Sequence, residues 1–124
     1  GDVSKVAKAV MGEAYGFQYT PQQRVKKLLE LWKSKVRPGV ITVDAICFDS
    51  TITPEDVARE TDLYCLASEQ PDLVRALGKY YARGPMINRQ GVIVGQRECR
   101  ASGVYTTSAS NSITCFLKAK AIPS

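Results

Sequence analysis

Apolar and basic side chains recur with helical spacing in the segment that follows Thr20. Thr20, Pro21 and Gln23 form a helix-start signal: a capping threonine, a proline suited to the first helical position, and a glutamine that completes a capping box. One face collects the apolar residues Val25, Leu28, Leu29, Trp32 and Val36, and much of the rest is the basic set Arg24, Lys26, Lys27, Lys33 and Lys35. The pattern predicts an amphipathic helix with a solvated lysine face, ended by Pro38–Gly39.

A short β-strand is predicted from Val40 to Ile46. This run is rich in β-branched residues and is interrupted only by Asp44. A carboxylate at such a position lies exposed at an edge, accepts backbone hydrogen bonds or holds a cation, because a bare buried charge is too costly. From the residues alone, a solvated strand end is the commoner outcome.

Two further helices begin at threonine or glutamine followed by proline. Thr53–Pro54 opens a helix to about Ser68, with acidic residues in its first turn where the helix dipole favours them. Gln70–Pro71 opens another, which runs to about Arg83 and is ended by Gly84–Pro85. A small hairpin is predicted from Met86 to Val94, turning at Asn88–Gly91.

The last predicted helix follows Ser102–Gly103 and continues to about Ala121. Its polar positions recur at one face, as Thr107, Asn111, Thr114 and Lys118, while Ile113, Phe116 and Leu117 are available for a core. Such a polar stripe either faces a polar partner or lies in solvent, and the pattern does not choose between them. Gly103 gives the preceding loop freedom to move.

Composition narrows the class of protein without fixing its function. The 124 residues are 44% hydrophobic, enough for one modest core, and no apolar run approaches the roughly 20 residues of a membrane span. The first residues lack both Met and a signal-peptide pattern. A net charge of +5 suits a phosphate-bearing partner, although many basic proteins bind no nucleic acid. Four cysteines without C-x-x-C spacing, and no histidine, argue against zinc and favour reduced buried thiols, with a disulfide left open.

Asp49 is not a simple duplicate of Asp44. Five residues of extended strand span about 16 Å, so the two carboxylates approach each other only if the chain turns after Ile46. Different roles are therefore expected. Taken alone, Asp49 reads as a cap or turn residue ahead of Ser50–Thr51.

Two separated segments carry a family resemblance. One is Val-Asp-Ala-Ile-Cys-Phe-Asp-Ser, from Val43 to Ser50, and the other is Arg-Ala-Ser-Gly-Val-Tyr-Thr-Thr-Ser-Ala-Ser-Asn-Ser, from Arg100 to Ser112. They resemble motifs A and B of viral RNA-dependent RNA polymerases, in the group of hepatitis C virus and the GB viruses (pegiviruses). Further matching segments include Tyr15–Tyr19, Trp32–Lys35 and Gly84–Pro85, so the resemblance covers almost the whole chain.

The resemblance implies roles for particular residues. Asp44, with the backbone carbonyl of Ala45, is expected to bind Mg²⁺ or Mn²⁺ in a two-metal nucleotidyl transfer, with Asp44 the catalytic carboxylate. Ser102, Asn111 and Asp49 are expected to read the ribose 2′-hydroxyl, with Thr107 in support. Arg100 is a candidate RNA or nucleotide contact, and a surface arginine is the alternative.

The resemblance also implies an architecture and partners. It predicts an α+β fold, helix-rich with a short palm strand and a small hairpin, that forms part of the palm and fingers of a right-hand polymerase. Residues 1–11 would end a fingers segment, 12–51 form a palm segment, 52–106 a fingers insertion and 107–124 a palm helix. The expected partners are RNA template, nascent strand, nucleoside triphosphates and other parts of the parent polymerase, in membrane-associated replication complexes of the host cytoplasm.

Two motifs of the family are missing from the sequence. There is no Gly-Asp-Asp motif C and no basic motif F, so this chain alone is expected to be inactive. A competing hypothesis is a small basic RNA-binding module without catalysis, in which Asp44 is a structural carboxylate. Exposed base-stacking aromatic side chains, with no metal near Asp44, would favour that alternative.

Overall fold

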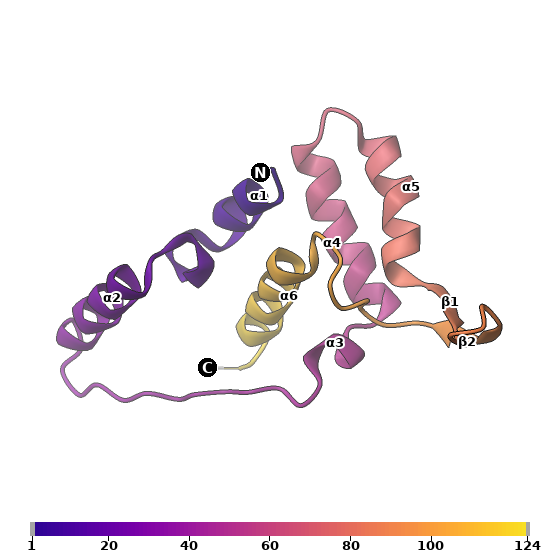
Figure 1. Ribbon diagram of the computed structural model, residues 1–124. Coiled ribbons are helices and arrows are strands. Elements are labelled where there is room, and N and C mark those ends of the chain that lie inside the picture. Colours follow the sequence, from indigo (N-terminus) through magenta and orange to yellow (C-terminus); the bar gives the residue numbers. More distant parts are fainter. Residues whose placement is uncertain (1, 124) are drawn as a thin grey trace.

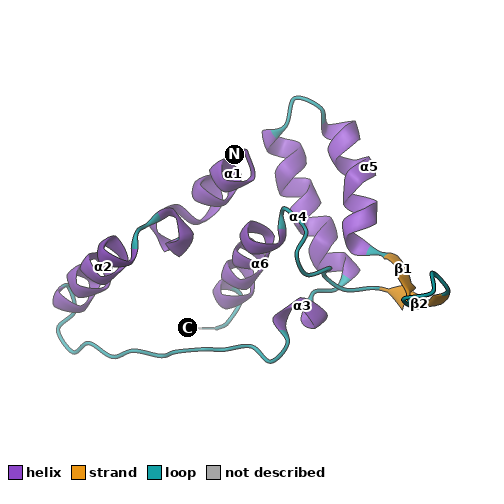
Figure 2. Ribbon diagram, in the orientation of Figure 1, coloured by secondary structure: helices purple, strands orange, loops and turns teal. Residues whose placement is uncertain are grey.

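The computed structural model describes residues 2–123, which form helices and one small antiparallel sheet (Figures 1 and 2). In chain order the elements are α1 (Asp2–Met11), the short 3₁₀ helices η1 (Gly12–Ala14) and η2 (Gly16–Gln18), α2 (Pro21–Lys33), α3 (Phe48–Thr51), α4 (Pro54–Ala67), α5 (Pro71–Ala82), β1 (Gly84–Ile87), β2 (Ile93–Arg97) and α6 (Thr107–Lys120). This composition agrees with the predicted α+β class. No helix within residues 2–123 combines the length and apolarity needed to cross a membrane.

Capping boxes are present at two predicted helix starts, the predicted one at Thr20 and a second one at Thr53 that was predicted only as a helix start. The Thr20 hydroxyl accepts the Gln23 backbone N–H at 3.2 Å, and the Gln23 side chain accepts the Thr20 N–H at 2.9 Å. Thr53 and Asp56 repeat the arrangement at 3.2 and 3.1 Å. These contacts satisfy backbone donors that the helix leaves open, so local sequence is enough to define the start of α2 and α4.

The predicted strand at Val40–Ile46 is wrong. The segment is extended but belongs to no sheet, and it runs as a long connection from α2 to α3 (Figure 2). Its apolar side chains are exposed, with Ile41 91% and Ile46 88% accessible. A strand needs a neighbour to receive its backbone hydrogen bonds, and no described residue supplies one here.

The predicted hairpin is confirmed, with longer strands than expected. β1 pairs antiparallel with β2 from Gly84–Arg97 to Ile87–Ile93, with an irregularity between Met86 and Ile87. In the turn, the Asn88 side-chain oxygen accepts backbone N–H groups from Gln90 at 2.9 Å and Val92 at 3.0 Å. Gly91 supplies the left-handed conformation of the turn, at φ +83°.

The core forms around α1, a helix that was not predicted. Its apolar residues recur at helical spacing and pack against α6 and α4. The buried set is Ala7, Met11, Tyr15, Ala109 and Ile113. Ile113 and Phe116 therefore join the core as predicted, whereas Leu117 is 37% exposed and does not.

Helix α2 buries none of its residues. It lies apart from the group formed by α1, α4, α5 and α6 (Figure 1). The short 3₁₀ helices join it to α1, and the extended segment leads from it to α3. The helix ends at Lys33, before the predicted stop at Pro38–Gly39, and Leu28 is 67% exposed. Its amphipathic pattern therefore predicts the helix correctly, but its apolar face packs against no core within residues 2–123.

Helices α4 and α5 approach closely at Gly78. A Cβ at this position would lie 2.6 Å from Thr61 Oγ1 and 2.8 Å from its Cγ2. Thr61 cannot easily move away, since it is β-branched and its hydroxyl donates to the Val57 carbonyl at 2.8 Å. Gly78 is thus required by packing, not by backbone conformation.

Gly78→Ala should lower the free energy of unfolding by about 1–2 kcal/mol, because overpacking outweighs the roughly 1 kcal/mol gain in helix propensity. Urea denaturation of the chain measures the change. In a Thr61→Ala background the obstructing atoms are gone, and the same substitution should stabilise. A stabilising effect in both backgrounds would show that the two helices do not meet at this position.

Candidate functional site

The polar stripe of α6 faces polar partners, not solvent. Asn111 donates to Asp49 at 2.7 Å, and Lys118 contacts Asp56 at 3.1 Å. Between them, the buried Thr114 hydroxyl donates to Glu60 on α4. One face of α6 is therefore held against α3 and α4 by a row of carboxylates, which decides between the two alternatives left open by the pattern.

Asp49 reaches this row because the chain turns after Ile46, although this turn does not bring Asp49 close to Asp44. Cys47 adopts a left-handed conformation, φ 48° and ψ 58°, which is unfavourable for a residue with a Cβ. Cys47, not Asp49, occupies the N-cap position of α3, and its carbonyl accepts the Ser50 N–H at 2.9 Å. The interpretation of Asp49 as a cap is therefore wrong.

Asp49 is the centre of a three-residue set. Its Oδ1 accepts the Asn111 amide at 2.7 Å, and its Oδ2 accepts the Ser102 hydroxyl. These two hydrogen bonds, with the nearby Arg100 charge, outweigh partial burial and hold the pKa of Asp49 below its usual value. Asp49 is therefore ionised at neutral pH and accepts hydrogen bonds only. The structure thus brings together three residues that the resemblance grouped.

The loop that carries Ser102 is fixed at both ends. Before it, the Arg100 backbone N–H donates to the Asp49 carbonyl at 3.1 Å. After it, the Thr107 hydroxyl donates to the Ala101 carbonyl at 3.1 Å. Gly103, at φ +83°, provides the left-handed residue that lets the loop turn into α6. Thr107 touches the loop and not the carboxylate, a geometry suited to a supporting role.

Arg100 is buried behind this set instead of lying at the surface. It is 4% exposed, and its three guanidinium nitrogens each donate: Nε to Asn111 Oδ1 at 2.8 Å, one terminal nitrogen to Glu60 Oε2 at 2.9 Å, and the other to Glu60 Oε1. All three guanidinium nitrogens of this arginine are thus engaged by acceptors within the protein. Sequence reasoning missed Glu60, since nothing in the residues of α4 separates it from an exposed helix carboxylate.

Asp44 and Ala45 stand apart from the set. Both are exposed in the extended connection, and none of the described hydrogen bonds or ion pairs involves Asp44. Within residues 2–123, no three acidic, cysteine or histidine side chains lie together as metal ligands. One carboxylate and one backbone carbonyl are suitable hard oxygen donors for Mg²⁺, but they fill only part of its six-fold shell. The described residues therefore bring no further acidic, cysteine or histidine ligand set to Asp44.

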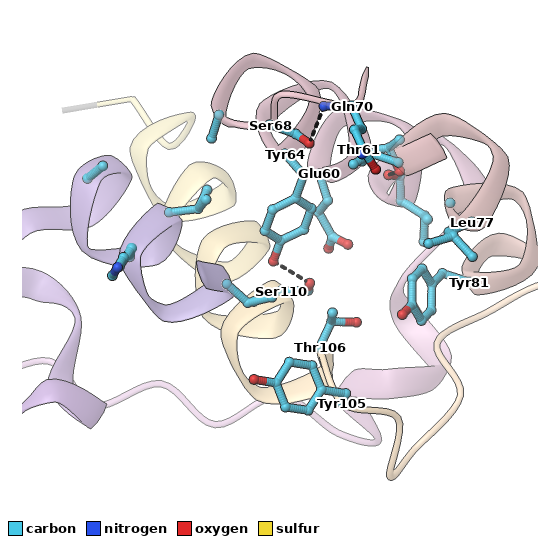
Figure 3. A pocket seen from close by; sticks show the side chains of 18 of the residues that line it. Glu60, Thr61, Tyr64, Ser68, Gln70, Leu77, Tyr81, Tyr105, Thr106 and Ser110 are labelled. Carbon is cyan, nitrogen blue, oxygen red and sulfur yellow. Dashed lines mark hydrogen bonds between the residues drawn. The ribbon is translucent and has the colours of Figure 1, made fainter. Parts of the chain in front are cut away.

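A cavity of about 850 Å³ opens beside Glu60 and Arg100, among α1, α4, α5 and the start of α6 (Figure 3). Tyr64 and Ser110 share a hydrogen bond of 2.8 Å at its wall. Burial raises the pKa of Tyr64, so the phenol is neutral there. The described lining includes Glu60 and Arg100 but none of Asp49, Ser102 and Asn111.

The four cysteines are free thiols, as preferred from their spacing. Burial differs from the expectation, because only Cys65 is buried, while Cys47 and Cys115 are exposed and Cys99 is half-buried. None of them lies close enough to a second cysteine to be paired in the described structure.

Comparison with known proteins establishes the class. Residues 2–124 match the family described as viral RNA dependent RNA polymerase, and the chain belongs to that family. Among its relatives, the genome polyprotein of hepatitis C virus genotype 1c (isolate India) is 52% identical over 123 residues, and that of genotype 6h (isolate VN004) is 48% identical over 121 residues. These alignments cover 96% and 94% of this chain but 4% of each polyprotein. The resemblance to polymerases of the hepatitis C group is thereby confirmed.

Proposed function

We propose that this sequence forms the ribose-reading part, and one side of the metal-binding part, of the nucleotide site in a polymerase that copies viral RNA from nucleoside triphosphates. RNA template, nascent strand and nucleoside triphosphates are its proposed partners, with Mg²⁺ or Mn²⁺ as the ion. Family membership supports the reaction class. This sequence corresponds to a small part of each polyprotein relative, so the reaction is proposed for the larger polymerase that contains it.

The observation that carries the proposal is the set formed by Asp49, Ser102 and Asn111. It joins α3, the loop before α6 and α6 itself through side chains 53 and 62 residues apart. Asn111 uses one amide proton on Asp49, and no described residue takes the other. A 2′-hydroxyl can accept that second N–H while donating to the Asp49 carboxylate. Deoxyribose offers neither contact, so the set suits discrimination of RNA precursors from DNA precursors.

The proposed role of Asp44 is to provide a carboxylate ligand, with the Ala45 carbonyl beside it. The exposure of both groups supports this role, since an ion and a triphosphate can reach them from solvent. When bound, two divalent ions about 3.5–4 Å apart would activate the primer hydroxyl and neutralise charge on the triphosphate. The remaining ligands must come from groups that residues 2–123 do not bring to Asp44.

We further propose the palm and fingers division at residues 11, 51 and 106. Helix α1 ends at Met11, α3 ends at Thr51 and α6 begins at Thr107, so all three boundaries coincide with ends of elements. The alternative, an RNA-binding module without catalysis, has exposed aromatic residues to offer: Phe17, Tyr80 and Tyr105. These lie on η2, α5 and the loop before α6, and such a module would bind RNA without discriminating between nucleoside triphosphates.

Asn111→Ala tests the ribose-reading role in a polymerase that contains this sequence. The variant should lose ribonucleotide efficiency much more than deoxynucleotide efficiency, narrowing their ratio about tenfold or more if one hydrogen bond of roughly 1.5–3 kcal/mol is lost. The measurement is kcat/KM for a nucleoside triphosphate and for its 2′-deoxy analogue.

Ser112→Ala is the matched control for this experiment. Ser112 is the next residue of α6, and its hydroxyl donates to the Ser108 carbonyl at 2.9 Å without contact to Asp49. It should leave the ratio unchanged. If Asn111→Ala lowers both efficiencies by one factor, Asn111 only supports the helix and the ribose-reading role is wrong.

A further inference from the structure

The buried ion pair behind Asn111 has more connections than a simple brace between helices. The Glu60 and Arg100 side chains are 3% and 2% exposed, and the carboxylate receives both terminal guanidinium nitrogens together with the Thr114 hydroxyl. This paired contact fixes the plane of the guanidinium, because Arg presents its donors as a rigid fork. The remaining Nε donor then points at Asn111.

The direction of that Nε–H decides which end of the Asn111 amide faces Asp49. An arginine can only donate, so the amide oxygen lies toward Arg100, at 2.8 Å, and the amide nitrogen toward Asp49, at 2.7 Å. A rotated amide would place oxygen against the carboxylate and NH₂ against the guanidinium, which makes two repulsive contacts in place of two attractive ones. The orientation leaves an N–H available for a ribose hydroxyl.

A second buried carboxylate on α4, Asp56, joins two helices without contacting the Asp49 set. Asp56, one turn before Glu60, also joins α4 to α6, through Lys118 at 3.1 Å. Burial alone would raise its pKa, but the Thr53 backbone N–H and Lys118 hold the pKa below its usual value. Asp56 has no described contact with Arg100 or Asn111. The two carboxylates share helix, burial and partner helix, and only Glu60 connects to the Asp49 set.

We propose that Glu60 and Arg100 are positioning residues for ribose selection. They act through Asn111, whose amide they hold in the orientation that donates toward Asp49 and toward a 2′-hydroxyl. This inference rests on the proposed function of the Asp49 set and adds to it the source of its orientation. Neither residue touches the sugar, and Arg100 does not contact phosphate.

The test uses the polymerase that contains this sequence, with Glu60→Gln, Arg100→Lys and Asp56→Asn as separate variants. Glutamine keeps the size of Glu60 but sets an NH₂ group against the guanidinium fork, while lysine keeps a buried cation opposite Glu60 but lacks the separate Nε donor from which arginine contacts Asn111. Two quantities are measured for each variant: the melting temperature, and the ratio of kcat/KM for a nucleoside triphosphate to that for its 2′-deoxy analogue.

Glu60→Gln and Arg100→Lys should each narrow the ratio by roughly fivefold, about the loss of one well-oriented hydrogen bond. Asp56→Asn should lower the melting temperature and leave the ratio within about twofold of wild type, because Asn111 keeps its orientation. In an Asn111→Ala background, Glu60→Gln should narrow the ratio no further, since contacting residues are not additive. Arg100→Lys retains the buried charge pair and remains measurable if Glu60→Gln fails to fold.

The outcomes separate this inference from the function on which it rests. If Asn111→Ala narrows the ratio but neither Glu60→Gln nor Arg100→Lys does, Asn111 reads the ribose without help and the positioning role is wrong. Equal narrowing by Asp56→Asn would likewise overturn it, because any loss of stability would then suffice. If Asn111→Ala itself leaves the ratio unchanged, the ribose-reading function fails first.

Discussion

Asp44→Asn is expected to lower the rate of nucleotide incorporation by a polymerase that contains this sequence about a thousandfold or more. Its affinity for RNA should stay within about twofold of the wild-type value. Asparagine keeps the size of the side chain but removes the charge that attracts a divalent ion. RNA is held mainly by basic residues, so its binding does not need this carboxylate. Primer extension measures the first quantity, and a salt-controlled binding titration the second.

Asp62→Asn is the matched control, since Asp62 is also an exposed carboxylate, paired at the surface with Arg75 at 3.0 Å. It should retain full activity. Activity of the Asp44→Asn polymerase within a few fold of wild type, at equal stability, would show that Asp44 is not a metal ligand.

The 124-residue chain alone should incorporate no nucleotide. It should bind Mg²⁺ only weakly by calorimetric titration, because Asp44 and Ala45 fill only part of the coordination shell of one ion.

Arg100→Ala is expected to cause the largest loss of stability in this chain, about 3–5 kcal/mol of the free energy of unfolding. The substitution leaves the Glu60 carboxylate buried without its cation and removes a partner from Asn111. Domains of ordinary stability have only about 5–15 kcal/mol in total, so the variant should be largely unfolded under mild denaturing conditions. Urea denaturation of the chain followed by circular dichroism measures it.

Two further variants show whether the cost comes from the unpaired charge. Arg75→Ala breaks the exposed Arg75–Asp62 pair and should change stability by less than about 1 kcal/mol. Replacing both buried partners, with Glu60→Leu and Arg100→Met, should recover most of the loss, because two apolar side chains leave no buried charge behind. If the Arg100→Ala chain were as stable as the Arg75→Ala chain, the prediction would be wrong. Water would then solvate the Glu60 carboxylate once its cation is removed.

Much of the helical structure could be predicted because its signals are local. The Thr20 and Thr53 capping boxes satisfy backbone donors within three residues, and the Asn88–Gly91 turn satisfies its own backbone, so neither depends on distant partners. Helix α1 was missed although its apolar residues have helical spacing. The strand at 40–46 failed for the opposite reason, since β-branched residues favour a strand only where a neighbour completes its hydrogen bonds.

The candidate site divides in the same way. Resemblance grouped Asp49, Ser102 and Asn111, but spacing alone left Asp49 as a turn residue. The contacts that join the three cross 53 and 62 residues of chain and exist only because Cys47 turns the chain and α6 lies against α4. Arg100 was expected near a surface, yet the fold buries it against Glu60, 40 residues away.

By itself the sequence determined the starts of α2, α4 and α5, the hairpin turn, the α+β class and the family. Each of these follows from residues close together in the chain or from motifs read directly. Only the tertiary structure decided which carboxylates are paired, buried or exposed: Glu60 and Asp56 are sealed against α6, while Asp44 stays in solvent. The physical reason is that the cost of burying a charge depends on the partners around it, and those partners come from distant segments that only folding brings together.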